Sequence, residues 1–137
     1  ARARPEAPPP AARVDTAQQL ERIRAKVPAA ERTRTSPAPP TLAALERARQ
    51  LYAERCAVCH GPAGDGRTPA AAAMDPPPVD FTHPAFARLE PGVTFYIIAH
   101  GSEGTGMPPW RDSLTDEEIW ALVHYLRRTF AQEEGGP

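Results

Sequence analysis

The chain has 137 residues, a length that accommodates one modest domain and an appendage but not two full domains. Its formal net charge of −1 at pH 7 argues against a nucleic-acid-binding protein that works by neutralising phosphates. Hydrophobic residues make up 41% of the chain, yet it contains 18 prolines, so a compact part must share the chain with a stretch that does not pack. No apolar run reaches the roughly 18 residues that a membrane span needs, and no signal-peptide pattern opens the sequence.

Charge is distributed unevenly along the chain. Residues 1–50 carry ten Lys or Arg against five Asp or Glu, whereas residues 51–137 carry six against twelve. Such a pattern is typical of a solvated basic tail attached to an acidic domain.

The N-terminal part is expected to be an extension rather than a domain. Residues 1–12 are rich in proline and favour an extended conformation. Residues 14–27 place apolar side chains near helical spacing, and Asp15 with Gln18 resembles a capping box, so a short helix is predicted there. Residues 28–40 form a second proline-rich connector.

The compact domain is expected to begin at Thr41, which is a suitable N-cap. We therefore divide the chain into an extension, residues 1–40, and a domain, residues 41–137. The helix after Thr41 would deliver Cys56 at its end. Four residues of this helix fall on one apolar face: Leu42, Leu45, Ala48 and Tyr52.

The middle of the domain carries weaker signals. Residues 61–80 contain many turn-forming residues and predict an irregular loop, and a short helix is expected within residues 83–89. Residues 92–100 are ambiguous, because their β-branched and aromatic residues favour a strand. We predict a helix here, since the segment is short and Gly101 can end it.

Residues 115–131 give the clearest helical signal. Thr115 and Glu118 form a capping box, and acidic and basic residues occupy the ends that the helix dipole favours. Apolar residues line one face: Ile119, Leu122, Val123, Leu126 and Phe130. The domain is thus predicted to be all-α with long loops, an arrangement that needs a further group to fill its centre.

The motif CAVCH at residues 56–60 has the spacing for covalent haem attachment. Thiols of Cys56 and Cys59 can add to the two vinyl groups, and the imidazole of His60 then lies against the iron. A thioredoxin-type site would need a βαβ context, and zinc would need further ligands at finger spacing. A structural disulfide would leave His60 without a role. We therefore predict one covalently bound haem c.

A six-coordinate iron needs a second axial ligand, and Met107 is the predicted one. It lies in the segment GTGMPP, where glycines permit close approach to the ring and Pro108 stiffens the loop. Met74 lies in an Ala-rich loop and is expected only to fill space. Three histidines compete as ligands: His83, His100 and His124.

At this point a family resemblance becomes specific. The segments YxxxCAVCHG, GDG, PPPxDF, HGSEGTGMPPW and LTDEEIWALVHYLRR resemble the class I monohaem cytochromes c of bacteria. These include proteins that serve terminal oxidases and alternative complex III. The resemblance covers residues 41–131, about two thirds of the chain. It implies an all-α cytochrome c fold, with short helices and loops around one covalent haem.

The resemblance also implies how the first and last helices of the domain meet. In this family they cross through a small residue and aromatic side chains, which here would be Ala48 and Tyr52 against Leu122 and Tyr125. The family usually has glycine where this chain has Ala48, so the crossing is expected to be slightly wider.

Further site residues follow from the resemblance alone. The family commonly holds the haem histidine through a proline carbonyl about nine residues on, which corresponds to Pro69. Trp110 and Arg111 resemble positions near the haem propionates, where an N–H donor and a guanidinium would offset the carboxylate charge.

The function implied is that of a single-electron carrier rather than an enzyme, because both axial positions of the iron would be filled. The expected partners are membrane respiratory complexes, an oxidase or a quinol-oxidising complex, with no nucleic acid and no small-molecule substrate. A monomer on the periplasmic side of the membrane is expected, either soluble or tethered. Two alternatives remain: a haem domain of a membrane-anchored complex, and a five-coordinate haem sensor.

Overall fold

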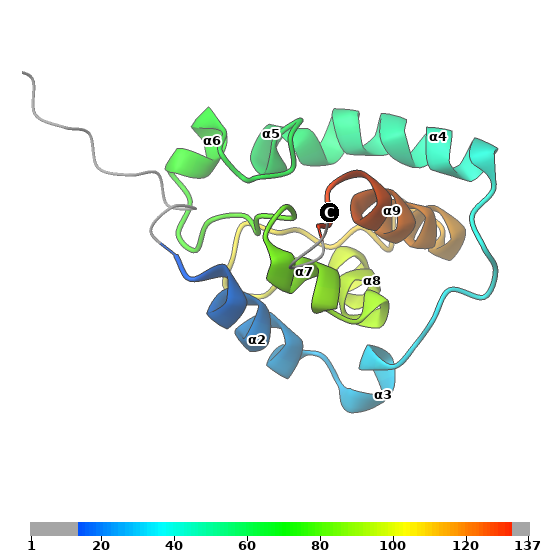
Figure 1. Ribbon diagram of the computed structural model, residues 1–137, viewed down its shortest axis with the longest axis horizontal. Coiled ribbons are helices and arrows are strands. Elements are labelled where there is room, and N and C mark those ends of the chain that lie inside the picture. Colours follow the sequence, from blue (N-terminus) through cyan, green and yellow to red (C-terminus); the bar gives the residue numbers. More distant parts are fainter. Residues whose placement is uncertain (1–13, 133–137) are drawn as a thin grey trace, which may run out of the picture.

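The computed structural model describes residues 14–132, and within this range the only regular elements are helices (Figure 1). The elements are α2 (Thr16–Lys26), α3 (Ala29–Arg32), α4 (Leu42–Leu51), the π-helix η1 (Tyr52–Cys56), α5 (Ala57–His60), α6 (Pro69–Ala72), α7 (Pro84–Arg88), α8 (Pro91–His100) and α9 (Asp116–Thr129). The all-α prediction is confirmed. In the part of the chain that is described, no helix has the length and apolar character to cross a membrane.

A continuous helical rod leads to the CAVCH motif. It begins where the side chain of Thr41 accepts a hydrogen bond from the backbone N–H of Ala44, as the capping pattern predicts. The rod continues from α4 through η1 into α5, so that both cysteines lie at its C-terminal end. The predicted apolar face is only partly correct, because Leu42 is 86% exposed and Leu51 is buried instead.

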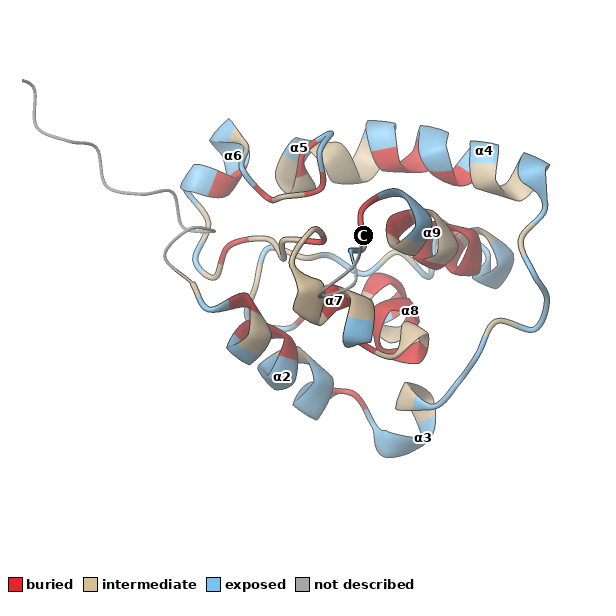
Figure 2. Ribbon diagram, viewed as in Figure 1, coloured by how far each residue is buried: buried red, intermediate tan, exposed pale blue. Residues whose placement is uncertain are grey.

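The most extensive contact between two helices in the described part of the chain is the crossing of α4 with α9, whose facing sides are buried (Figure 2). Ala48 and Leu122 are 0% and 2% exposed, which is consistent with a small side chain at the crossing. The ring of Tyr52 packs at 5.6 Å from that of Tyr125, and its hydroxyl donates a 2.6 Å hydrogen bond to the carbonyl of Gly61. The crossing therefore fixes the start of the loop that follows His60.

Helices α8 and α9 complete the core. Residues 92–100 are helical, as predicted, and the backbone N–H of Gly101 bonds to the carbonyl of Ile97 at a φ of 74° that favours glycine. The α9 capping box is also confirmed, because Thr115 and Glu118 each bond the other's backbone N–H. Phe95 of α8 stacks on Trp120 of α9 with their centroids 4.4 Å apart.

The extension packs on this core along residues 14–34. Asp15 caps the start of α2, where its side chain accepts from the N–H of Gln18, and both Leu20 of α2 and Val27 just after the helix are buried. Just past α2, the backbone of 31–34 comes so close to α8 that a Cβ on Gly92 would lie 2.5 Å from the carbonyl oxygen of Glu31. Contacts therefore cross the predicted boundary at residue 40. The division into an extension and a domain stays a prediction. Residues 1–13 of the predicted extension lie outside the described range.

Candidate functional site

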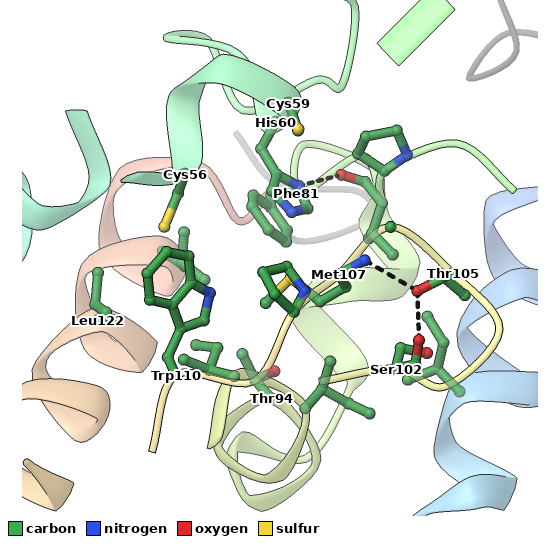
Figure 3. Close-up of a pocket in the computed structure, with 18 of the residues that line it drawn as sticks. Cys56, Cys59, His60, Phe81, Thr94, Ser102, Thr105, Met107, Trp110 and Leu122 are labelled. Atoms are coloured by element: carbon green, nitrogen blue, oxygen red, sulfur yellow. Dashed lines mark hydrogen bonds between the residues drawn. The ribbon is translucent and has the colours of Figure 1, made fainter. Parts of the chain in front are cut away.

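A cavity of about 400 Å³ opens in the centre of the helices, within the roughly 300–1,000 Å³ that ligand sites span (Figure 3). Aliphatic, aromatic and proline side chains from α2, η1, α7, α8, α9 and the intervening loops make up most of its wall. Cys56, Cys59, His60 and Met107 all face it. Two segments about 50 residues apart in sequence thus bring their thiol, imidazole and thioether groups into one apolar space.

The two cysteines stand at the end of the α4–α5 rod. Both are free thiols, so the disulfide alternative is not realised. Burial raises the pKa of the Cys56 thiol to about 11, which keeps it protonated at neutral pH. Within residues 14–132, no three His, Cys, Asp or Glu side chains gather as a metal cluster, which disfavours the zinc alternative.

His60 is held at one of its ring nitrogens. Nδ1 lies 3.2 Å from the carbonyl oxygen of Val79, and the ring stacks on Phe81 with centroids 4.4 Å apart (Figure 3). A donor role for Nδ1 leaves the Nε2 lone pair available to a metal. Burial lowers the pKa of His60 to about 4, so the imidazole is neutral at physiological pH.

The predicted role of Pro69 in holding His60 is wrong. The carbonyl beside Nδ1 belongs to Val79, nineteen residues after His60, and Pro69 instead occupies the first turn of α6 outside the cavity wall. The reason is the intervening loop, which contains α6 before the chain returns to the imidazole through the prolines at 76–78.

The Met107 loop is tied together by short-range hydrogen bonds. The N–H of Ser102 bonds to the carbonyl of Met107, while the Thr105 hydroxyl donates to the Ser102 carbonyl and accepts from the Met107 N–H. A Cβ on Gly101 would meet the Met107 carbonyl oxygen at 2.9 Å, so glycine is required where the loop folds back. These bonds direct the Met107 side chain toward the cavity (Figure 3).

Met74 is closer to the site than its sequence context indicated. It lines the same cavity as Met107, and a Cβ on Gly106 would overlap its terminal methyl group. The structure therefore places both methionines at the cavity wall.

The competing histidines lie elsewhere. His83 caps α7 by accepting from the N–H of Ala85, and His100 is exposed and packs against the ring of Tyr96. His124 lies on α9 beside a second, shallow pocket near residues 35–39. None of the three lines the central cavity within the described residues.

Of the neighbouring residues Trp110 and Arg111, only Trp110 lies in the cavity wall. Trp110 lines the cavity, and the Arg55 guanidinium sits 5.7 Å from the centre of its ring. The side chain of Arg111 is exposed and is not part of the cavity wall, because backbone bonds from 110–111 to Ile98 and Ala99 hold this pair along the end of α8. The cation beside Trp110 is therefore Arg55, which the sequence patterns did not single out.

The residues present suit a haem. An apolar wall matches a flat macrocycle, and the paired thiols with an adjacent neutral imidazole match its covalent attachment and axial ligation. Three buried polar oxygens on the wall, those of Gln19, Thr94 and Ser102, have no hydrogen-bond partner in the described part of the chain. Such orphaned groups call for a ligand with polar substituents.

Comparison with protein families supports this interpretation. The model of the family described as cytochrome c oxidase, cbb3-type, subunit III matches residues 43–126, more than half of the chain. The chain belongs to the cbb3-type subunit III cytochrome c family. It accordingly adopts the cytochrome c fold, carries haem c with its iron, and acts in electron transport.

A solved structure is also similar. A chain of the reducing HAO-like protein complex of Kuenenia stuttgartiensis superposes with a TM-score of 0.60 and is 29% identical in sequence. The match covers 71% of this chain and 48% of that one, so this chain spans about half of the other's length. A comparison with curated proteins found no match.

The family match does not include α2. The match begins at residue 43, whereas five residues of α2 line the cavity: Gln19, Leu20, Arg22, Ile23 and Lys26. Sequence patterns gave these residues no role, and their only signal was the thin apolar stripe of residues 14–27.

Proposed function

We propose that this cbb3-type subunit III relative is a single-electron carrier whose haem c is bound through thioethers of Cys56 and Cys59, with His60 and Met107 as axial ligands. The observation that carries the proposal is the convergence of these four side chains on one apolar cavity. The haem iron supplies the one-electron chemistry, and the residues of the chain hold the group and exclude water.

The geometry around His60 supports its role as a ligand. The Val79 carbonyl orients the ring through Nδ1, and such partners fix the tautomer of metal-bound histidines. On the other side, the bonds within the loop from Ser102 to Met107 restrict where the thioether can reach.

Filling both axial positions leaves no open position for a substrate, which supports a carrier rather than an enzyme. Met with His ligation favours ferrous iron and hence a fairly high potential, suited to the oxidising end of a respiratory chain. We propose an oxidase or a quinol-oxidising complex as its redox partner, and a monomer located on the periplasmic side of the membrane.

A second candidate is a haem domain within a larger membrane complex. Two findings favour it. The family is named for a subunit of an oxidase, and the similar Kuenenia chain is part of a protein complex. This chain spans only about half of the length of that Kuenenia chain. Electron exchange of the free protein with membranes that lack the complex would distinguish a diffusing carrier from a fixed domain.

The proposal is tested by making the same substitution at each of the two methionines and comparing the two variants. Met107→Ala should remove the sixth ligand, abolish the sulfur-to-iron charge-transfer band of the oxidised protein and lower the potential, because the preference of the thioether for ferrous iron is lost. Carbon monoxide should then bind the reduced protein readily.

Met74→Ala is the matched control, since Met74 lines the same cavity. It should retain the charge-transfer band and remain unreactive with carbon monoxide. If the Met107 variant keeps the parent's absorption bands while the Met74 variant loses them, Met74 is the ligand and the proposed assignment is wrong.

A further inference from the structure

Helix α2 forms a wall of the haem cavity that lies outside the family match. It spans two loops, because Gln19 Nε2 donates to the Pro77 carbonyl at 2.8 Å and Lys26 Nζ donates to the Glu103 carbonyl at 3.3 Å. A two-pronged ion pair between Arg24 and Glu90, at 2.7 and 2.9 Å, joins the outer side of α2 to the start of α8. These contacts hold α2 in place along its length, and its side chains line the cavity.

The charges on the cavity wall are all of one sign. Arg22 and Lys26 of α2 and Arg55 of η1 line it, and among residues 14–132 no Asp or Glu does. Arg22 and Lys26 are four residues apart, so they lie on one face of α2. The Arg22 guanidinium has no ion-pair partner within the described range. This wall is complementary to an anion.

Two buried hydroxyls on the wall lack an acceptor. Thr94 and Ser102 are each 7% exposed, and the oxygen of each side chain has no hydrogen-bond partner in the described structure. A buried O–H group without a partner costs free energy, so both hydroxyls require an acceptor atom in the cavity. A carboxylate supplies such acceptors and also matches the cations.

Haem chemistry decides which cations meet the carboxylates. The two propionates are on the pyrrole rings opposite those that carry the vinyl groups, and Cys56 and Cys59 would fix the vinyl edge. Ser102 and Thr105 lie beside α2, across the cavity from Cys56 and Trp110 (Figure 3). Arg55 immediately precedes Cys56 and stacks on Trp110, so it belongs to the vinyl side. Trp110 then lies on that side too, and not near the propionates as the family resemblance implies.

We propose that α2 supplies the propionate site, in which Arg22 and Lys26 bind the two carboxylates together with the hydroxyl of Ser102. This inference rests on the proposed attachment of haem at Cys56 and Cys59. It gives the basic extension a function in the cofactor site itself, rather than as a tether.

The test uses the full-length holoprotein with Arg22→Gln, Lys26→Gln and the double variant. Removing cations beside the propionates should favour the more positive, oxidised haem and lower the midpoint potential. We expect the double variant to shift the ratio of oxidised to reduced protein at fixed potential by about tenfold, which is about 59 mV for one electron. The carboxylate bands in the oxidised-minus-reduced infrared difference spectrum should move as well.

Arg49→Gln is the matched control, because it removes the same charge from α4, where Arg49 pairs with Glu46 away from the cavity. It should leave the infrared carboxylate bands unchanged and the potential close to that of the parent. Ser102→Ala removes one hydroxyl without a charge change and should move the same infrared bands as the double variant.

The outcomes separate this inference from the function on which it rests. If the parent protein shows the spectrum of covalent haem, but the Arg22 and Lys26 variants change the midpoint potential and the infrared bands no more than Arg49→Gln does, the propionate site is wrong and the proposed function stands. A large change of midpoint potential in Arg55→Gln, with no change in the α2 variants, would place the propionates beside Arg55 and would also contradict the propionate site on α2. A parent protein without covalent haem would instead refute the proposed function.

Discussion

The crossing of α4 with α9 and the α2 wall enclose the same cavity by different means. The crossing is built from large buried side chains, with Leu51, Leu122 and Ile119 each at most 2% exposed. The α2 wall has Leu20 and Val27 as its buried apolar residues, and it relies otherwise on single polar contacts to two loops and on the Arg24–Glu90 ion pair, while the 31–34 backbone just after it fits against Gly92.

The two regions therefore contribute different properties to the protein. Apolar burial at the crossing stabilises the fold directly, since the free energy it contributes scales with the apolar area removed from water. The α2 wall contributes less burial and more charge, so we expect it to tune the cofactor more than it stabilises the fold.

We expect the largest loss of stability when a buried side chain at the α4–α9 crossing is truncated. Leu122→Ala should lower the free energy of unfolding by about 2–5 kcal/mol, because it leaves a cavity between tightly packed helices. Denaturant unfolding of the holoprotein measures the loss. Leu20→Ala makes the same change in α2, where one face is solvent-exposed, and its loss of free energy of unfolding should be near the lower end of that range. Equal losses in the two variants would remove the distinction between the two regions.

The sequence predicted the ends of the helices far better than the contacts between distant segments, for physical reasons. Asp15, Thr41, Thr115 and Glu118 act within one helical turn of their partners, so their roles are visible in local patterns. The Gln19 contact with Pro77 joins residues 58 apart, and nothing near either residue signals it.

The candidate site shows the same division. Cys56, Cys59 and His60 belong to one short motif and were found together, whereas the carbonyl beside His60 comes from Val79 because of the path of an irregular loop. That path depends on tertiary packing, and neither spacing nor family resemblance predicted it.

An intermediate effect is expected from Gly92→Ala. Alanine is the better helix former, by about 1 kcal/mol, yet its Cβ would lie 2.5–2.8 Å from the carbonyl oxygens of Glu31, Arg32 and Arg34. We expect the overlap to dominate and to cost about 1–3 kcal/mol. Limited proteolysis should show faster cleavage within residues 28–40, with the α4–α9 part still protected. A variant more stable than the parent, with unchanged cleavage, would show that the extension does not pack on α8.

The smallest effect is expected from surface ion pairs. Arg24 pairs with Glu90 and Arg49 with Glu46, and both arginine side chains are about half exposed, so solvent screens the pairs. Neither Arg24→Gln nor Arg49→Gln should change the unfolding midpoint measurably. Hydrogen exchange of α2 should rise in Arg24→Gln alone, because only that pair joins the extension to the domain. Faster exchange throughout the molecule would mean that the α2 wall stabilises the whole fold.

The most direct test of one haem enclosed by both regions is the NMR spectrum of the reduced, diamagnetic holoprotein. The ring current of a haem in the cavity should shift the Met107 methyl group far upfield. Because they line the same space, the methyl groups of Leu20 and Ile23 on α2 should shift together with those of Leu122 and Leu126 on α9. Unshifted Leu20 and Ile23 methyl groups beside strongly shifted α9 methyl groups would contradict the account, since the haem would then be walled by the domain alone.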